Sequence, residues 1–413
     1  MSVVGVGDVE ASGGRLCLRP GDVLTPLARD RAADLGVVIE VAPSAGGPAT
    51  ARSPARSRAR PESTPTDAPP SGALYRRGAP VVTERVRVER VLGPNPARRR
   101  GENRTGRATV VGAGHVGATT ALRLAEADAF DEVVLVDVVP GLAAGLALDL
   151  WHSSGLRRFA TRLRGTTDLA EAADSDFVVV TAGRARQPGM SRTDLTAVNA
   201  AIVGDVSENI RLHSPDAIVI VVTNPLDEMT HLAWQTTGFP APRVMGMAGV
   251  LDAARFCALA ALAAGERPDA VQAVALGSHG DEMVIPLSQA RIGAEAITRR
   301  LDVATLAALV DRTRQSGAEV VKLLGKGSAY FAPAAAVAAM VLAMANDTGE
   351  VLPACVRADG AYGLDGVYVG LPARLGAAGV VEVVELPLAP AELEELRQAA
   401  QRIRERVGEL APA

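Results

Sequence analysis

The sequence predicts an α/β protein in which a doubly wound parallel sheet is followed by an α+β domain. Strand-like and helix-like segments alternate over residues 106–247, in the order ATVVGAG, VGATTALRLAEAD, VVLVD, DFVVVTAG and AIVIVVTN. After Ala248 the pattern changes to long helices and a few strands. We expect helices at Val250–Ala264, Ala304–Leu324, Ala334–Ala345 and Ala391–Leu410, and strands at Val271–Gly277, Val367–Val369 and Val380–Leu386. The change of pattern predicts a second domain over residues 248–413.

The first 105 residues predict a small module and a linker. Residues 1–43 contain the strand-like segments RLCLRPGD and VVIEV on either side of a short helix, PLARDRAADLG. Residues 44–105 are rich in Pro, Ala, Ser, Thr and Arg, a composition typical of a largely disordered linker, with an edge strand possible at Val81–Val91.

The linker is also basic. From Ser44 to Arg107 there are 14 arginines against 5 acidic residues, a net charge of +9 that could attract nucleic acid or an acidic partner. Tyr75 is the only aromatic residue in this stretch, and no nucleic-acid-binding fold is recognised. We therefore expect no nucleic-acid partner, and keep open a protein partner for this N-terminal extension.

Composition also argues against several classes of protein. Cys17, Cys257 and Cys355 are far apart and lack metal or redox spacing, so we expect no metal site and a reducing, cytoplasmic setting. The first ten residues lack the basic region of a secretory signal. The uncharged run Ala329–Ala345 is mostly alanine and is shorter than the ~20 apolar residues of a membrane span. We expect a buried or subunit-interface helix there, and no membrane association.

A glycine-rich turn follows the first strand of the parallel domain. GAGHVG occupies Gly112–Gly117 and opens a helix, so backbone can approach a pyrophosphate at the helix N-terminus. Asp137 ends the next strand, twenty residues after Gly117, where a carboxylate can accept hydrogen bonds from both ribose hydroxyls and repel a 2′-phosphate. The pattern predicts an NAD-binding Rossmann domain. The candidate cofactor residues in the turn are Gly112, Ala113, Gly114, His115, Val116 and Gly117, although a solvent-facing role is the simpler interpretation of His115.

Two arginines, Arg186 and Arg192, stand six residues apart in RQPGMSR, directly after the strand-like segment DFVVVTAG. With Pro188 and Gly189 between them, we expect both on a loop at the sheet edge, where α/β enzymes bind ligands. The pair indicates a ligand with more than one anionic group. The spacing alone does not exclude a phosphate or a nucleic acid.

A candidate acid–base group lies in the second domain. His279 stands in GSHGD after the strand-like VQAVALG, and VLDAARF places Asp252 and Arg255 three residues apart on one helix face. A carboxylate paired with the imidazole would favour the charged ring and fix its tautomer. The alternative for His279 alone is a structural histidine.

These segments together resemble the lactate and malate dehydrogenase family, and specifically malate dehydrogenases of the lactate-dehydrogenase-like branch. GAGHVG, VLVD, TAGRARQPGMSR, VVTNPLD, GMAGVLDAARF, LGSHGD and GSAYFAPA occur in the family's order, from about Arg107 onward. The resemblance implies an oxidoreductase that oxidises (S)-malate to oxaloacetate reversibly with NAD, as in the tricarboxylic acid cycle. It also implies a homodimer or homotetramer, and makes residues 248–413 the substrate domain.

The resemblance further implies a role for each matching residue. His279 would be the proton acceptor and Asp252 its orienting carboxylate, while Arg255 would hold the substrate's C1 carboxylate. Arg192 would polarise the C2 oxygen, and Arg186 would pair with the distal carboxylate that lactate lacks. The remaining matches are to cofactor contacts at Asn199, Val222 and Thr223, and at Asn224, which would also touch the C2 oxygen.

Two alternatives remain at this point. A lactate or other 2-hydroxyacid dehydrogenase would normally carry Gln in place of Arg186. A scaffold protein could instead use residues 1–105 for recruitment and merely bind cofactor. The family usually has an aliphatic residue and proline where Arg184 and Ala185 stand, so the arginine loop gains a positive charge here.

Overall fold

The computed structural model describes residues 3–4, 8–9, 11–18, 23–24, 32, 35–41, 105–184, 191–280, 282–325 and 327–410. The chain divides into two compact units, Met1–Val81 and Val82–Ala413. The linker expected at residues 44–105 and the edge strand expected within it lie outside the described residues, apart from Thr105.

The N-terminal unit contains two pairs of parallel strands. β1 (Val3–Val4) pairs with β3 (Val23–Leu24), and β2 (Arg15–Leu18) pairs with β4 (Val38–Val41). The strands expected in RLCLRPGD and VVIEV correspond to β2 and β4. Val9 and Ala32 are buried in a small apolar cluster with Leu16 and Val37. Most of the short helix expected between these strands lies outside the described residues.

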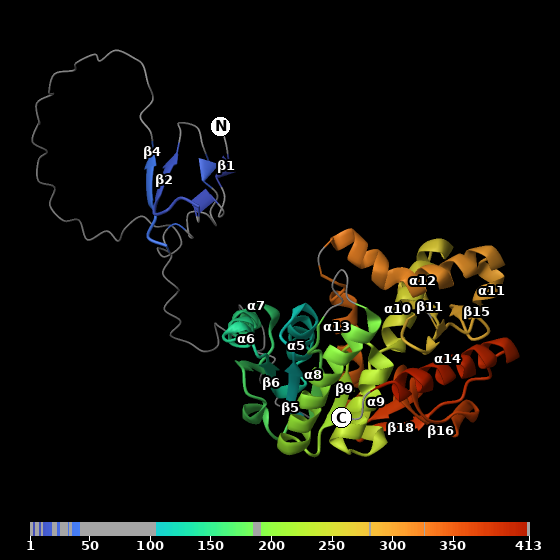
Figure 1. Cartoon of the computed structure of the whole chain (residues 1–413). Helices are drawn as coiled ribbons and strands as arrows, with labels where there is room; N and C mark the ends of the chain where they lie inside the picture. Colours follow the sequence, from blue (N-terminus) through green and yellow to red (C-terminus); the bar gives the residue numbers. More distant parts are fainter. Residues whose placement is uncertain are drawn as a thin grey trace, which may run out of the picture. The chain divides into compact units, whose positions relative to one another are not determined.

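An eleven-stranded mixed sheet organises the second unit (Figure 1). Its parallel half has the order β7-β6-β5-β8-β9-β10, so the strand order reverses between β5 and β8. The bounds are β5 Thr105–Val111, β6 Phe130–Val136, β7 Arg162–Thr166, β8 Phe177–Val180, β9 Ile218–Val221 and β10 Val244–Gly246. Ligands of doubly wound sheets bind at such a reversal, beyond the carboxyl ends of the strands.

Helices cover both faces of the parallel half, which explains why its central strands β8 and β9 are continuous apolar runs. In β8, Phe177 and Val179 pack toward α5, α6 and α13, whereas Val178 and Val180 pack toward α8 and α9. The helices are α5 His115–Glu126, α6 Leu142–His152, α7 Ser154–Arg157, α8 Arg192–His213, α9 Leu226–Thr237 and α13 Phe331–Ala345. The alanine-rich run is therefore a buried helix, as expected. No helix among the described residues is long and apolar enough to cross a membrane.

The antiparallel half of the same sheet continues from β10 through β16, β17, β12 and β13, with β18 on β17. These strands are β12 Leu276–Gly277, β13 Met283–Val284, β16 Val351–Asp359, β17 Asp365–Gly376 and β18 Gly379–Val383. The helix α14 (Pro390–Gly408) packs on β17 and β12. Since the sheet is continuous across Ala248, the domain boundary expected there stays a prediction.

A smaller three-stranded sheet accompanies the remaining helices. It contains β11 Val271–Gln272, β14 Arg291–Ile292 and β15 Glu295–Ala296, beside α10 Gly249–Ala264, α11 Ile297–Arg300 and α12 Val303–Leu324. Short 3-10 helices occupy Leu169–Ala172, Ala241–Arg243, Pro268–Ala270 and Ala361–Gly363.

Two of the expected strands need correction, and several strands were not expected at all. The strand expected at Val271–Gly277 is two strands, β11 and β12, which belong to different sheets. The strand expected at Val367–Val369 is the middle of the twelve-residue β17. The sequence reading missed its partner β16, because VLPACVRAD carries a proline and two charged residues that obscure a simple alternating pattern.

The packing of β7 against α6 generates a stability prediction. A Cβ atom on Gly165 would lie 2.1 Å from the carbonyl carbon and oxygen of Ala143. Gly165→Ala should therefore lower the free energy of unfolding by about 2 kcal/mol, measured by urea denaturation.

Gly145, exposed within α6, provides the control. A Cβ there meets nothing within 4 Å, so Gly145→Ala should raise stability by about 0.5–1 kcal/mol. Equal stability of the two variants would contradict the packing argument.

Candidate active site

The glycine-rich turn joins β5 to α5 at the carboxyl end of the sheet. Gly112 has a φ of 101°, which favours glycine, and a Cβ on Gly117 would lie 1.8 Å from the Gly112 carbonyl oxygen. α5 can therefore begin tightly against the strand end, with Gly114 at its N-cap and exposed. This close approach fits a pyrophosphate bound by backbone N–H groups.

Asp137 directly follows β6 and lies next to this turn. Its Oδ2 accepts a hydrogen bond from the Ala113 N–H at 2.7 Å, and its Oδ1 accepts one from the Val139 N–H at 2.9 Å. These bonds fix a partly exposed carboxylate beside the turn, where it fits the hydroxyls of an adenosine ribose.

His115, the first residue of α5, is exposed and stacks on Tyr330 at the start of α13, with ring centroids 5.0 Å apart. The stack places an aromatic pair at the mouth of the turn. Contact between His115 or Val116 and a cofactor stays a prediction.

Hydrogen bonds tie together the segments that follow β8 and β9. The Asn199 side chain is buried in α8; its Nδ2 donates to the Asn224 carbonyl at 2.6 Å and its Oδ1 accepts from the Arg184 N–H at 2.7 Å. The Thr223 hydroxyl donates to the Ala182 carbonyl at 2.6 Å. Asn199 therefore fixes the backbone around Asn224, whereas the sequence reading gave it direct contact with the cofactor; that contact stays a prediction.

His279 and Asp252 come together from separate elements. His279 follows β12, and Asp252 lies in the first turn of α10. The His279 Nδ1 and the Asp252 Oδ2 are 2.8 Å apart, and the Asp252 side chain is only 2% exposed. Arg255 donates from Nη1 to the other carboxylate oxygen, Oδ1, at 3.2 Å. One buried carboxylate thus orients both an imidazole and a guanidinium.

The environment of His279 favours its charged form. Burial lowers the pKa of the imidazole, but the charge and hydrogen bond of Asp252, with the charge of Asp227, outweigh burial and the nearby Arg255, so the net pKa is raised above 6.5. The His279 side chain is still 18% exposed, so a bound molecule could reach it.

The structure corrects the placement of one of the two loop arginines. Arg192 is the first residue of α8 and not a loop residue, because Ser191 caps the helix in a reciprocal capping box with Asp194. Arg186 lies outside the described residues, and nothing is described of the Arg192 side chain.

Comparison with known proteins places this constellation in a family. Residues 106–246 match the NAD binding domain, and residues 249–411 the alpha/beta C-terminal domain, of lactate/malate dehydrogenases. The chain belongs to the lactate/malate dehydrogenase family. It is therefore an oxidoreductase whose first matched domain binds NAD.

Several relatives within this family are highly similar. A malate dehydrogenase of Nostoc punctiforme is 49% identical over 302 residues, which cover 73% of this chain and 92% of the relative. A malate dehydrogenase of Methanosarcina barkeri is 45% identical over 303 residues, 73% of this chain and 98% of the relative.

Solved structures give the same fold. The malate dehydrogenase of Salinibacter ruber has a TM-score of 0.70 at 42% identity and covers 73% of this chain and 96% of its own. The lactate dehydrogenase of Cryptosporidium parvum, solved with lactic acid and the nicotinamide cofactor, has a TM-score of 0.71 at 33% identity and covers 75% and 100% of the two chains.

The sequence analysis did not assign a role to Asp227, which lies next to His279. Asp227, in α9, is 2% exposed, and its Oδ2 accepts hydrogen bonds from the Ser278 hydroxyl at 2.7 Å and the His279 N–H at 3.2 Å. Burial, the largest effect, raises the pKa of the Asp227 carboxyl. An acidic residue shortly after the apolar run AIVIVV was the available sequence signal.

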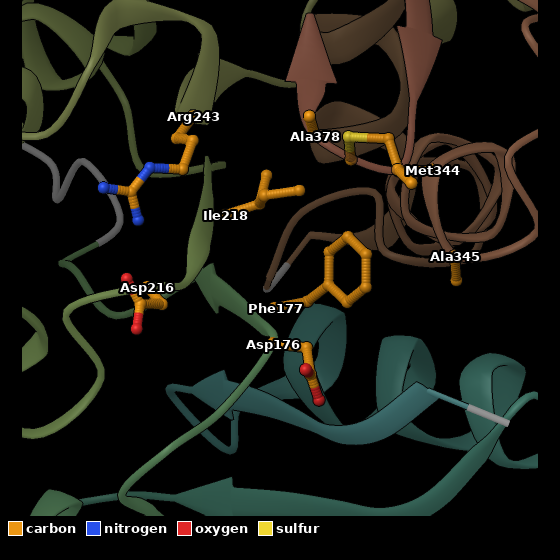
Figure 2. Close-up of a pocket in the computed structure, with 9 residues that line it drawn as sticks. Asp176, Phe177, Asp216, Ile218, Arg243, Met344, Ala345 and Ala378 are labelled. Atoms are coloured by element: carbon orange, nitrogen blue, oxygen red, sulfur yellow. The ribbon is translucent and has the colours of Figure 1, made fainter.

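A pocket of about 230 Å³ lies at the amino ends of the parallel strands, opposite the carboxyl ends that carry the glycine-rich turn (Figure 2). Phe177 and Ile218, the first residues of β8 and β9, line it, so it is distant from the carboxyl-end turn. Its Asp176 accepts from the Arg107 N–H at 2.7 Å, and its Arg243 donates to the Pro215 carbonyl at 2.8 Å. These charged groups already serve the fold, and the pocket is not part of the dehydrogenase site.

The pair geometry generates a prediction that needs no substrate. In an NMR titration the His279 ring should have a pKa above the ordinary value of about 6.5. Asp252→Asn removes the charge that raises it, so the His279 pKa should fall in that variant. Asp269→Asn, at an exposed carboxylate that pairs with Arg267, is the control and should leave the pKa unchanged. An equal pKa in the parent chain and Asp252→Asn would contradict the coupling.

Proposed function

We propose that this chain is an NAD-dependent malate dehydrogenase that interconverts (S)-malate and oxaloacetate. The observation that carries the proposal is the buried His279–Asp252 pair with Arg255 on the same carboxylate, in a chain whose relatives named malate dehydrogenase are up to 49% identical. The decisive measurement is NADH oxidation by the full chain with oxaloacetate against pyruvate.

Proton transfer is assigned to His279. Its Nδ1 is bonded to Asp252, so we assign proton acceptance from the C2 hydroxyl to Nε2. Asp252 would hold the tautomer and stabilise the imidazolium that forms. Bound NAD⁺ would supply the acceptor for the hydride that leaves C2.

The arginines are assigned to the substrate's anionic groups. Arg255, already oriented by Asp252 and 17% exposed, would bind the C1 carboxylate through its remaining donors. Arg192 would polarise the C2 oxygen together with Asn224. Arg186 would pair with the distal carboxylate, and this assignment rests on the sequence motif.

The cofactor-binding residues are assigned in the same way. The turn Gly112–Gly117 would hold the pyrophosphate and Asp137 the adenosine ribose. Val222, Thr223 and Asn224, which follow β9, would line the nicotinamide end, with Asn199 keeping that segment in place. Among the described residues, no group of three or more His, Cys, Asp or Glu side chains could hold a metal ion.

A second candidate is a lactate or other 2-hydroxyacid dehydrogenase. The similarity to a lactate dehydrogenase solved with lactic acid supports it. Arg186 favours malate, because an arginine among substrate groups favours a carboxylate partner over the methyl group of lactate. Recruitment through the N-terminal extension is compatible with either activity.

For the cellular setting we propose a cytoplasmic homodimer or homotetramer that serves the tricarboxylic acid cycle, with a protein partner for the N-terminal extension. Exposed apolar side chains support assembly: Leu148 in α6 is 55% exposed and Leu156 in α7 is 87% exposed. The three cysteines are free, which agrees with a reducing compartment.

Replacing the proton acceptor tests the mechanism. His279→Asn should lower kcat about 1,000-fold, because no group then accepts the hydroxyl proton, whereas the NADH affinity measured by fluorescence should be retained. His152→Asn, at an exposed histidine of α6, should turn over like the parent chain. Parent-level turnover in His279→Asn would refute the assigned base.

Arg186→Gln tests substrate choice. It should lower kcat/KM for oxaloacetate about 100-fold and raise the relative rate with pyruvate, because the distal carboxylate loses its partner. Arg184→Gln removes an exposed charge from the same segment and should leave the oxaloacetate-to-pyruvate ratio unchanged. A full oxaloacetate preference in Arg186→Gln would show that the specificity assignment is wrong.

A further inference from the structure

A buried polar chain connects His279 to the helix α14. Asp227 Oδ2 receives both the His279 N–H and the Ser278 hydroxyl. The Ser278 oxygen in turn accepts from Arg406 Nη2 at 3.1 Å. The backbone that carries the imidazole is therefore linked to α9 and α14 through side chains.

Arg406 joins three elements around this point. Besides Ser278, its Nε donates to Glu228 at 2.6 Å and its Nη1 donates to Glu282 at 2.8 Å. Ser278 and Glu282 stand on the two sides of His279 in the sequence, between β12 and β13, and Glu228 belongs to α9. One guanidinium thus holds both ends of the segment that bears His279.

The ion pair between Arg406 and Glu228 is largely buried. The side chains of Arg406 and Glu228 are 18% and 3% exposed. Burial lowers the pKa of the Arg406 guanidinium, but Glu282 and Glu228 outweigh this and raise it overall. Breaking such a pair leaves a buried charge without compensation, so the arrangement resists displacement.

We propose that Asp227 and Arg406 are positioning residues for the proton acceptor. Asp227 fixes the His279 backbone, and Arg406 holds the neighbouring Ser278 and Glu282, so that the imidazole stays aligned with Asp252. This inference rests on the proposed role of His279 as the base. A displacement of 1 Å at a catalytic group costs on the order of 100-fold in rate, which is why such support matters.

Asp227 also acts on the imidazole by its charge. The charged groups that face His279 are Asp252, Asp227 and Arg255. The first two favour the imidazolium and the third opposes it. Removing the Asp227 charge should therefore lower the pKa of His279, which a purely structural hydrogen bond would not do.

Two arginines on α14 allow a matched test of positioning. Arg402 also pairs with Glu282, at 3.1 Å, but the described contacts do not join it to Ser278 or Glu228. Arg406→Lys keeps the charge but cannot reach all three partners at once, so kcat should fall about tenfold with the NADH affinity unchanged. Arg402→Lys should keep the parent kcat. Equal kcat values in the two variants would overturn the role of Arg406.

Asp227 is tested by two substitutions. Asp227→Asn keeps an oxygen that can accept from Ser278 and His279, so kcat should stay within about threefold of the parent. Asp227→Ala removes that acceptor, and kcat should fall about 30-fold in a chain that still binds NADH. Parent-level kcat in Asp227→Ala would overturn the positioning role of Asp227. If that variant does not fold, the kcat of Arg406→Lys and the His279 pKa in Asp227→Asn test the proposal instead.

An NMR titration separates this inference from the proposed function. The chain has 5 histidines, and the His279 signal is identified by its loss in His279→Asn. Asp227→Asn should lower the His279 pKa by about half a unit, and the acidic limb of malate oxidation should move to lower pH with it. An unchanged pKa would overturn the coupling. A parent chain inactive with oxaloacetate would refute the proposed function and still leave this measurement decisive.

Discussion

The mixed sheet changes from parallel to antiparallel pairing at Gly246, where β10 meets β16 through Cys355. A Cβ on Gly246 would lie 2.4 Å from the Thr230 hydroxyl of α9 and 3.0 Å from the Cys355 Cβ. The close contact of three elements at this point therefore requires glycine. Because the sheet continues here, the antiparallel strands that carry His279 are held in fixed register with the strands of the NAD domain.

The acid–base group depends on charges that the fold keeps from water. Asp252 and Asp227 are both buried and approach His279 from two different helices, one at the ring and one at the backbone. An isolated buried carboxylate is costly, and each of these two receives two hydrogen bonds. The bonds to Asp252 and to the Oδ2 of Asp227 also orient the imidazole and its backbone, so stability and chemistry are linked at this point.

Sequence alone predicted β5, β6, β8 and β9 of the parallel half. It missed β7, whose sequence RLRGT is largely polar, and the three-residue β10. The central strands β8 and β9 are apolar on both faces, and the glycine turn and Asp137 have a spacing that follows from the geometry of one β-α-β unit. These patterns can be recognised in the sequence because each depends only on residues that are close together in the chain. The strands after Ala248 were predicted less well: β16 was missed, and β11 and β12, which belong to different sheets, were merged. Short or irregular strands depend on their partners for pairing.

The candidate site divides in the same way. The sequence by itself determined the residue types, the family resemblance and the pairing expected for His279, Asp252 and Arg255, since their motifs are local. Only the tertiary structure decided that Asp227 lies under His279 and that Arg406, far along the chain, holds the same segment. These contacts join residues separated by 52 to 128 positions. No local sequence pattern predicts contacts between residues so far apart in the chain, because these contacts depend on how the sheet brings α9, α10 and α14 together.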